Sequence, residues 1–272
     1  MTASSVFAAL HLGARPFVLP NAWDVASALL LVDAGFPAIG TTSLGVTAAA
    51  GLPDGAGAGR EPTVALAREL VPRLPVPLTV DLEGGYADDP GAVAALATEL
   101  ADLGVAGVNL EDGRADGRLR PVAEHAAVIG AVASAAPTLF VNARTDTYWL
   151  RVGPEDRRLD ETTRRLTAYR DAGASGVFVP GLSDLAHTTI VADAVGLPLN
   201  VLWRPGVDLS ALADAGVARV STGSALYRHA LAAALTAAAA ARSGGQPPTV
   251  PVDYDALQHH LRAPRPPSLT EP

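Results

Sequence analysis

The sequence predicts an α/β fold: a (β/α)8 barrel of the TIM type with a short C-terminal helical extension. Three observations lead to this prediction. Short apolar runs alternate eight times with helical patterns along the 272 residues. The apolar runs become acidic only where they end, which is typical of buried parallel strands that deliver charge to one rim. Glycine stands at four of the joints where a helix gives way to the next strand.

The strands and helices can be assigned in chain order. The expected strands cover residues 17–20, 38–42, 78–82, 107–110, 139–143, 176–179, 197–202 and 218–221. The expected helices cover 4–11, 23–34, 62–71, 90–103, 121–135, 155–171, 182–195, 209–215 and 225–241, with a last short helix at 253–262. Residues 43–59, which are rich in glycine and alanine, are expected to form a long loop, and loops of this length are usually functional or mobile.

Local signals support these boundaries. Residues 21–24 follow the first strand and are expected to lead it into a capped helix at 23–34. Glycine follows a helix at four joints, where it can adopt the left-handed conformation that reverses the chain; these are Gly35, Gly104, Gly173 and Gly216. The first strand is not followed by the Gly-x-Gly-x-x-Gly fingerprint of a dinucleotide-binding sheet. The barrel is therefore favoured over an open, doubly wound sheet.

Two absences from the composition exclude several kinds of chemistry. The sequence has no cysteine and no lysine, so its twenty basic residues are all arginines. A thiolate nucleophile, a disulfide, a zinc–thiolate site and a lysine Schiff base are therefore excluded, and so is a Walker P-loop.

The charge and hydropathy patterns predict a cytoplasmic protein without nucleic-acid or membrane partners. The net charge is −8, and the arginines are scattered rather than clustered. No signal peptide is evident, and the alanine-rich stretch 225–241 is too weakly hydrophobic to span a membrane. We expect a catalytic barrel domain over residues 1–242, followed over 243–272 by a linker rich in proline and glycine, a short helix and a disordered tail.

Polar side chains gather at the C-terminal ends of the expected strands, and in such barrels this end carries the active site. In chain order they are Asn21, Ser43, Asp81, Glu83, Glu111, Asp112, Arg144, Asp146, Asn200, Arg204 and Ser221. Carboxylates without histidine or cysteine suit Mg²⁺, with Mn²⁺ as an alternative. Arg144 could clamp a substrate carboxylate in bidentate fashion, and Asn200 is a further candidate for substrate binding.

Structural roles stay open for some of these residues. Asp81 and Glu83 could instead cap a helix or pair with Arg144, although the second acidic pair on the neighbouring strand favours a metal site. Asp146 is expected to hold Arg144 or to cap the following helix. The six histidines lie within expected helices or before the first strand, so structural or solvated roles are expected for them.

Six motifs, taken together and in this order, resemble the isocitrate lyase/phosphoenolpyruvate mutase superfamily. They are PNAWD at 20–24, TSLG at 42–45, GLPD at 51–54, VDLEGGY at 80–86, NLED at 109–112 and NARTD at 142–146. The resemblance implies a (β/α)8 barrel that assembles as a homodimer or homotetramer, with the last barrel helix packed on a neighbouring subunit. The site residues that it implies are Asp81, Glu83 and Glu111 for Mg²⁺, Ser43, Leu44 and Gly45 for a carboxylate or phosphonate group, Arg144 for the carboxylate end, and Asp54 nearby as a catalytic group.

Members of this superfamily make or break a bond to C3 of pyruvate, and Mg²⁺ neutralises the oxyanion charge that develops. The isocitrate and methylisocitrate lyases carry a Lys-Lys-Cys-Gly-His loop, and the mutases use a lysine and an asparagine in the same loop. Residues 113–120 of this chain contain no cysteine, lysine or asparagine. The enolate-stabilising half of the site is therefore expected without a recognisable proton donor, and Tyr86 or a water molecule could supply the proton.

The leading prediction is a Mg²⁺-dependent lyase that cleaves or forms a C–C bond of a small 2-oxo or 2-hydroxy carboxylic acid through a pyruvate enolate-like intermediate. One alternative is a phosphonopyruvate C–P hydrolase or a phosphoenolpyruvate mutase-like enzyme, in which Arg114, Arg118 and Arg120 could attract a phosphonate. Another alternative is a barrel that binds a carboxylate without turning it over.

Overall fold

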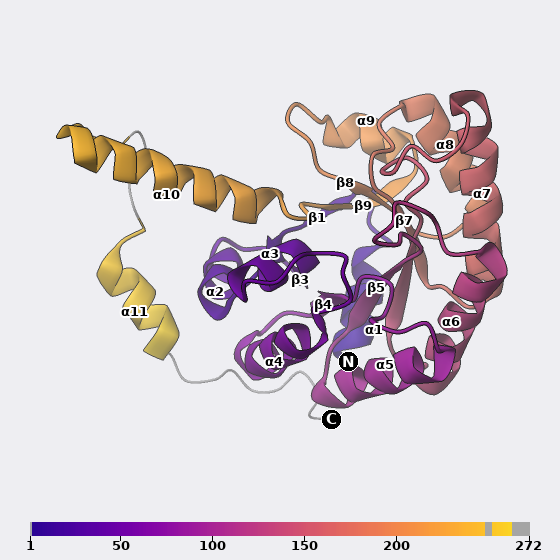
Figure 1. Ribbon diagram of the computed structural model, residues 1–272, viewed down its shortest axis with the longest axis horizontal. Helices are drawn as coiled ribbons and strands as arrows, with labels where there is room; N and C mark the ends of the chain where they lie inside the picture. The colour runs from indigo at the N-terminus through magenta and orange to yellow at the C-terminus, as the bar shows by residue number, and fades with distance from the viewer. Residues whose placement is uncertain (1, 248–251, 263–272) are drawn as a thin grey trace.

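A closed ring of parallel strands forms the centre of the computed structural model, which describes residues 2–247 and 252–262. Within these ranges nine strands make one sheet in the order β1-β9-β8-β7-β6-β5-β4-β3-β2. The first two are halves of one strand: β1 (Phe17–Leu19) pairs with β9, and β2 (Asn21–Ala22) pairs with β3. Pro20 separates them because it has no N–H group for the ladder. The predicted TIM-type barrel is confirmed (Figure 1).

The remaining strands lie close to their expected positions. They are β3 (Ile39–Thr41), β4 (Leu78–Asp81), β5 (Gly107–Glu111), β6 (Phe140–Arg144), β7 (Gly176–Val179), β8 (Leu199–Leu202) and β9 (Val217–Ser221). Each strand pairs in parallel with its neighbours. All the C-terminal strand ends, and the polar residues that they carry, therefore meet at one end of the barrel.

Helices follow the strands and surround them (Figure 1). They are α1 (Ala3–Leu10), α2 (Val25–Asp33), α3 (Ser43–Ala49), α4 (Arg60–Leu70), the 3-10 turn η1 (Val71–Arg73), α5 (Pro90–Leu103), α6 (Val122–Ala135), α7 (Glu155–Asp171), α8 (Leu185–Val195), α9 (Leu209–Asp214), α10 (Ala225–Ser243) and α11 (Tyr254–Arg262). The Asp24 carboxylate caps α2 by accepting from the Ser27 N–H at 2.7 Å. The four glycines expected at helix ends all have positive φ, between 81° and 106°.

One segment differs from the prediction, because residues 43–59 were expected to form a continuous loop. Residues Ser43–Ala49 form helix α3 instead, and only the part that follows is irregular. The first N–H of this helix, that of Ser43, donates to the Asp81 carboxylate at 3.2 Å, so a group distant in sequence satisfies it. Position 45 of α3 requires glycine, because the Cβ atom of any other residue would lie only 2.8 Å from the Trp23 Cβ.

The opposite, N-terminal end of the barrel is closed by α1. Phe7 is fully buried there and makes edge-to-face contacts with Phe17 and Phe140, at centroid distances of 6.2 and 5.4 Å. His11 follows α1 and stacks on Phe140. Access to the barrel interior is therefore from the C-terminal strand ends.

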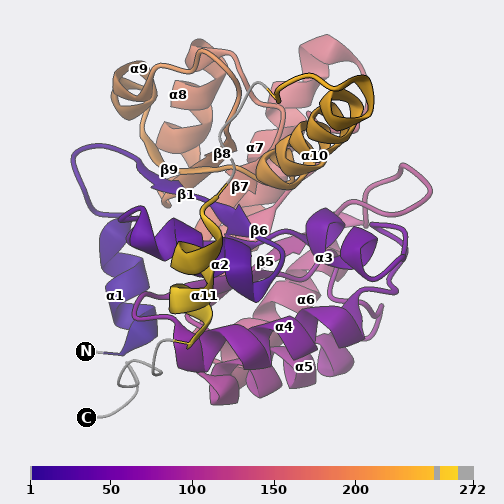
Figure 2. The ribbon, with the colours of Figure 1, turned by 90° about the vertical axis from the view of Figure 1, so that its left-hand side faces the viewer.

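The last helices lie apart from this ring. Helix α10 extends away from the barrel (Figure 1), whereas α11 lies against α2 (Figure 2). Ala225 is the buried residue of α10, and its Leu235 is 73% exposed. Among the residues described, no helix combines the length and the hydrophobicity needed to cross a membrane. The predicted disordered tail at 265–272 lies outside the described residues.

Candidate functional site

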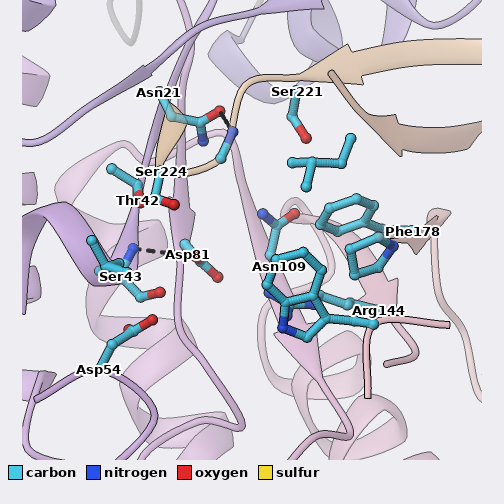
Figure 3. Close-up of a pocket in the computed structure, with 15 residues that line it drawn as sticks. Asn21, Thr42, Ser43, Asp54, Asp81, Asn109, Arg144, Phe178, Ser221 and Ser224 are labelled. Carbon is cyan, nitrogen blue, oxygen red and sulfur yellow. Dashed lines mark hydrogen bonds between the residues drawn. The ribbon is translucent and has the colours of Figure 1, made fainter. Parts of the chain in front are cut away.

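A cavity opens where the C-terminal strand ends meet, and we call it the central cavity. It encloses about 600 Å³ of space, its mouth included, which suits a small-molecule ligand. Its lining residues are Asn21, Thr42, Ser43, Leu44, Asp54, Asp81, Asn109, Arg144, Trp149, Phe178, Pro180, Leu202, Ser221, Gly223 and Ser224. Ser43, Asp54 and Asp81 form one side, and Phe178 lies on the opposite side (Figure 3).

The acidic side of the central cavity is built by β4, α3 and the loop after α3. The Asp81 carboxylate accepts from the Ser43 N–H, and the Asp81 N–H donates to Thr41 Oγ1 at 3.0 Å. The Ser43 and Asp54 side chains point toward one another (Figure 3). Burial raises the pKa of Asp54; a hydrogen bond from Ser43 opposes this rise, and the negative charge of Asp81 adds to it.

Glu83 is held next to this acidic side by strained backbone. Its φ of 50° lies in the left-handed region, which non-glycine residues rarely occupy and which is strained for a glutamate. The side chain is buried: Oε2 accepts from the Gly57 N–H at 3.3 Å, and Oε1 has no hydrogen-bond partner among the residues described. Burial raises the pKa of Glu83 to about 7, and the nearby Asp54 and Asp81 contribute to this rise.

Arg144 stands at the end of β6 between two carboxylates. Its Nη1 lies 2.5 Å from Glu111 Oε2, and its Nε donates to Asp146 Oδ1 at 2.6 Å. Burial alone would lower the pKa of Arg144, but Glu111 and Asp146 outweigh it and raise the pKa above its usual value. Burial in turn raises the pKa of Glu111 well above its ordinary value, although Arg144 opposes this. The guanidinium also lies 5.6 Å from the centre of the Phe178 ring.

The buried carboxylate of Asp112 holds the backbone next to Arg144 in place. It is fully buried, and its Oδ1 accepts from the Asp146 N–H at 2.9 Å. Its Oδ2 accepts from Thr145 Oγ1, Arg165 Nη1 and Tyr169 OH at 2.8, 3.1 and 2.7 Å. The carboxylate therefore connects the end of β5, the end of β6 and helix α7, and it fixes the backbone that carries Asp146.

The structure brings seven of the residues predicted from the sequence into the central cavity: Asn21, Ser43, Leu44, Asp54, Asp81, Arg144 and Ser221. Glu83 and Tyr86 instead border a neighbouring second cavity, where the Tyr86 hydroxyl lies 3.1 Å from Thr63 Oγ1. Asn200 is buried, and its Nδ2 donates to Ser221 Oγ at 3.1 Å.

The three carboxylates expected to hold a metal are neighbours, but they face different partners. Asp81 accepts from Ser43, Glu83 accepts from Gly57, and Glu111 pairs with Arg144. Within residues 2–247 and 252–262, no three acidic or histidine side chains converge on one position that could hold a metal ion. The carboxylates still affect one another, because Asp81 and Glu83 both raise the pKa of Glu111.

Comparison with known proteins assigns the family. The profile of the phosphoenolpyruvate phosphomutase family matches residues 7–242. The chain belongs to the isocitrate lyase/phosphoenolpyruvate mutase superfamily. The resemblance identified in the six sequence motifs is thereby confirmed.

Three relatives show how far the similarity extends along the chain. An uncharacterized protein of Mycobacterium tuberculosis (strain ATCC 25618 / H37Rv) is 46% identical over 252 residues, which are 93% of this chain and 94% of that protein. The 2-methylisocitrate lyase of Bacillus subtilis (strain 168) is 34% identical over 189 residues, which are 66% of this chain and 60% of the lyase. A crystal structure from Burkholderia cenocepacia J2315, provisionally described as a lyase/mutase, is 35% identical with a TM-score of 0.87, covering 97% of this chain and 96% of that one.

The loop in which the superfamily's lyases carry their cysteine is a short hairpin in this chain. Gly113 and Leu119 form an antiparallel bridge at its base. Arg114 contacts Glu124 and Asp88 at 3.2 and 3.5 Å, and Arg120 contacts Asp88 at 3.2 Å. The hairpin borders the second cavity, and the described residues that line the central cavity come from other segments.

Sequence reasoning did not identify several residues of the central cavity. Asn109 could have been found, because it alternates with Glu111 on β5 and so faces the same side of the strand. Trp149 is 55% exposed and lies in the turn after β6, where no local pattern marks it as a site residue. Ser224 precedes α10 but makes no capping hydrogen bond to it, so its hydroxyl is free to face a ligand.

Proposed function

We propose that this chain is a Mg²⁺-dependent lyase that cleaves or forms a C–C bond of a small 2-oxo or 2-hydroxy carboxylic acid through a pyruvate enolate-like intermediate. The observation that carries the proposal is the group of carboxylates beside Arg144 at the C-terminal end of the barrel. Membership of a superfamily that includes lyases and mutases, with a 2-methylisocitrate lyase among the relatives, supports it.

The donor chemistry fits a divalent cation. The acidic groups offer oxygen atoms only, which Mg²⁺ and Mn²⁺ prefer. Oε1 of Glu83 is buried without a partner among the described residues. Burial raises the pKa of Asp54, Glu83 and Glu111, and neighbouring carboxylates add to the rise at each of them. Asp81, Glu83 and Glu111 would hold the cation, which requires them to turn from their present partners. When bound, it would stabilise oxyanion charge in the substrate.

The chain's own residues would bind and orient the acid. Arg144 supplies a planar guanidinium for a carboxylate, and Ser43 supplies a hydroxyl at the same cavity. Leu44 and Gly45 lie in the first turn of α3, where backbone N–H groups are not satisfied within the helix. Asn200 would contribute to substrate binding indirectly, because its Nδ2 donates to the hydroxyl of Ser221, which lines the central cavity.

Two residues are candidates to move the proton. Asp54 lies in the central cavity, and burial raises the pKa of its carboxyl group, which favours its protonated form relative to an exposed aspartate. Tyr86 is bound to Thr63 at the second cavity, so it would reach a substrate in the central cavity only after its loop moved. We therefore favour Asp54 as the residue that holds the proton. The phosphonate alternative is less favoured, because Arg114 and Arg120 already pair with carboxylates.

We also propose that the chain forms a homodimer or homotetramer. Helix α10 extends from the barrel with Leu231 and Leu235 exposed at 48% and 73%. Because two leucines four residues apart lie on one helix face, a second copy would bury both.

The test is a proton and phosphorus NMR time course with a pool of oxaloacetate, phosphonopyruvate, phosphoenolpyruvate, methylisocitrate, citramalate and malate, run with Mg²⁺ and with EDTA. We expect one 2-oxo or 2-hydroxy acid to disappear only with Mg²⁺, and Asp81→Asn to abolish this loss. Turnover of phosphonopyruvate or phosphoenolpyruvate alone would favour C–P chemistry. Tight binding of oxalate, an enolate mimic, without any turnover would favour a non-catalytic barrel.

A further inference from the structure

The interior of the barrel holds an arginine without a counter-ion. Arg219 on β9 is 0% exposed, and no carboxylate among the described residues pairs with it. Burial lowers the pKa of Arg219 to about 9, so the side chain remains a cation at neutral pH. A buried charge without a partner is costly to the fold, and a residue of this kind calls for a functional explanation.

The contacts of Arg219 divide between the two ends of the barrel. Toward the N-terminal end, its Nη1 lies 3.5 Å from His11 Nε2, and its guanidinium lies 5.8 Å from the centre of the Phe7 ring. The His11 Nδ1 lies 2.9 Å from the Phe7 carbonyl and must donate to it, which leaves a lone pair on Nε2 for the arginine. In the other direction, Nη2 donates to Asn109 Oδ1 at 3.2 Å.

Asn109 connects this buried cation to the central cavity. Its Oδ1 accepts from both Arg219 Nη2 and Asn142 Nδ2, the latter at 2.8 Å. Because an arginine can only donate, the amide atom that faces it must be the oxygen. The amide nitrogen is left without a partner among the described residues, and the side chain lines the central cavity between Asp81 and Phe178 (Figure 3).

We propose that Asn109 is a substrate-binding residue, which donates from Nδ2 to an oxygen of the anionic substrate, and that Arg219 is the positioning residue that fixes and polarises its amide. This inference rests on the proposed function, because it names a further contact for the same acid. The cation strengthens the Asn109 donor, since electron density in the amide is drawn toward its oxygen. It also supplies positive charge in the low-dielectric interior of the barrel.

The test compares four proteins by calorimetric titration with oxalate in the presence of Mg²⁺: wild type, Arg219→Met, His11→Gln and Asn109→Asp. Arg219→Met leaves every lining residue unchanged but removes the cation and one of the two donors to the Asn109 oxygen, so only Asn142 still holds the amide. We expect it to weaken oxalate binding by about tenfold, the size of one hydrogen bond assisted by charge. His11→Gln changes the contact that Arg219 makes toward the N-terminal end of the barrel, away from Asn109. We therefore expect the oxalate affinity of this variant to stay within about twofold of wild type.

The Asn109→Asp variant separates this role from a merely structural one. It would give Arg219 a carboxylate partner, so we expect an unchanged or higher melting temperature together with oxalate binding at least tenfold weaker than that of wild type. Unchanged oxalate affinity in Arg219→Met overturns the positioning role, as does a lowered melting temperature in Asn109→Asp. Failure of the wild type to bind oxalate would overturn the proposed function and the donor role of Asn109. Stabilisation by Asn109→Asp would then support only the coupling of Arg219 to that side chain.

Discussion

Replacing Asp112 with asparagine should lower the stability of the fold, because the carboxylate is fully buried and accepts four hydrogen bonds. The substitution Asp112→Asn keeps the shape of the side chain but removes its negative charge. If the amide oxygen stays on the Asp146 N–H, the amide nitrogen faces the groups that now donate to Oδ2. The hydroxyls of Thr145 and Tyr169 can turn and accept from it, but Arg165 cannot.

The expected magnitude follows from the partners that Arg165 keeps. Removing one member of a fully buried ion pair costs about 3–5 kcal/mol. Arg165 retains its contacts with Glu161 Oε1 at 2.7 Å and the Arg120 carbonyl at 2.9 Å, so the lower end of this range applies. We expect the free energy of unfolding to fall by about 3 kcal/mol, which lowers the melting temperature by roughly 6–12 °C in a chain of this size.

The control is Glu161→Gln, because it removes the second carboxylate from the same arginine. The Glu161 side chain is 32% exposed, so water replaces the lost contact, and we expect a loss below about 1 kcal/mol. Denaturant unfolding of wild type and both variants, followed by fluorescence and by circular dichroism, provides the comparison. If Asp112→Asn lost no more stability than Glu161→Gln, Asp112 would not be the counter-ion of Arg165, and the argument from burial would be refuted.

Three further predictions concern other parts of the molecule. His125→Phe should reduce the loss of stability on acidification. Burial lowers the pKa of His125 to about 3, so the unfolded state takes up a proton near pH 6.5 while the folded state does not, and stability falls as the pH drops from 6.5 toward 3. The free energy of unfolding, measured by thermal unfolding at pH 8 and at pH 5.5, should therefore differ between the two pH values by about 1 kcal/mol less in the variant. Tyr86→Phe should keep turnover within about threefold of wild type while Asp54→Asn loses about a hundredfold, and the reverse order in steady-state rates would make Tyr86 the proton donor. Leu231→Glu combined with Leu235→Glu should convert an oligomer to monomers in light scattering, and an unchanged mass would refute burial of this face.

Much of the barrel could be predicted because its signals are local and repeated. Apolar strands, helix caps and C-terminal glycines each follow from a few neighbouring residues, as at Asp24 and Gly104. The helix at Ser43–Ala49 could not be predicted in this way, because the carboxylate that accepts from its first N–H is Asp81, 38 positions along the chain. Sequence patterns contain no information on such a tertiary partner.

The same limit applies to the site. The strand-end rule identified Asp81 and Arg144 as cavity residues, because position in a parallel barrel fixes the end at which they lie. It gave no indication that Tyr86 and Glu83 border a different cavity, which depends on the left-handed backbone at both residues. Nor could it identify Arg219, since an arginine in the middle of a strand gives no sign of what it faces across the barrel.

The two buried arginines explain how a cavity rich in carboxylates could bind an acid. Arg144 lies 2.5 Å from Glu111 and 2.6 Å from Asp146, so its charge is already neutralised where it stands. Arg219 has no carboxylate partner among the described residues, and its contact with Asn109 connects its charge to the cavity. A divalent cation bound to Glu111 would neutralise that carboxylate in place of Arg144, so part of the positive charge of Arg144 would become available to a ligand. The acid would then meet positive charge from Arg144 and, through Asn109, from Arg219, and the cost of burying Arg219 unpaired would be offset only when an anion is bound.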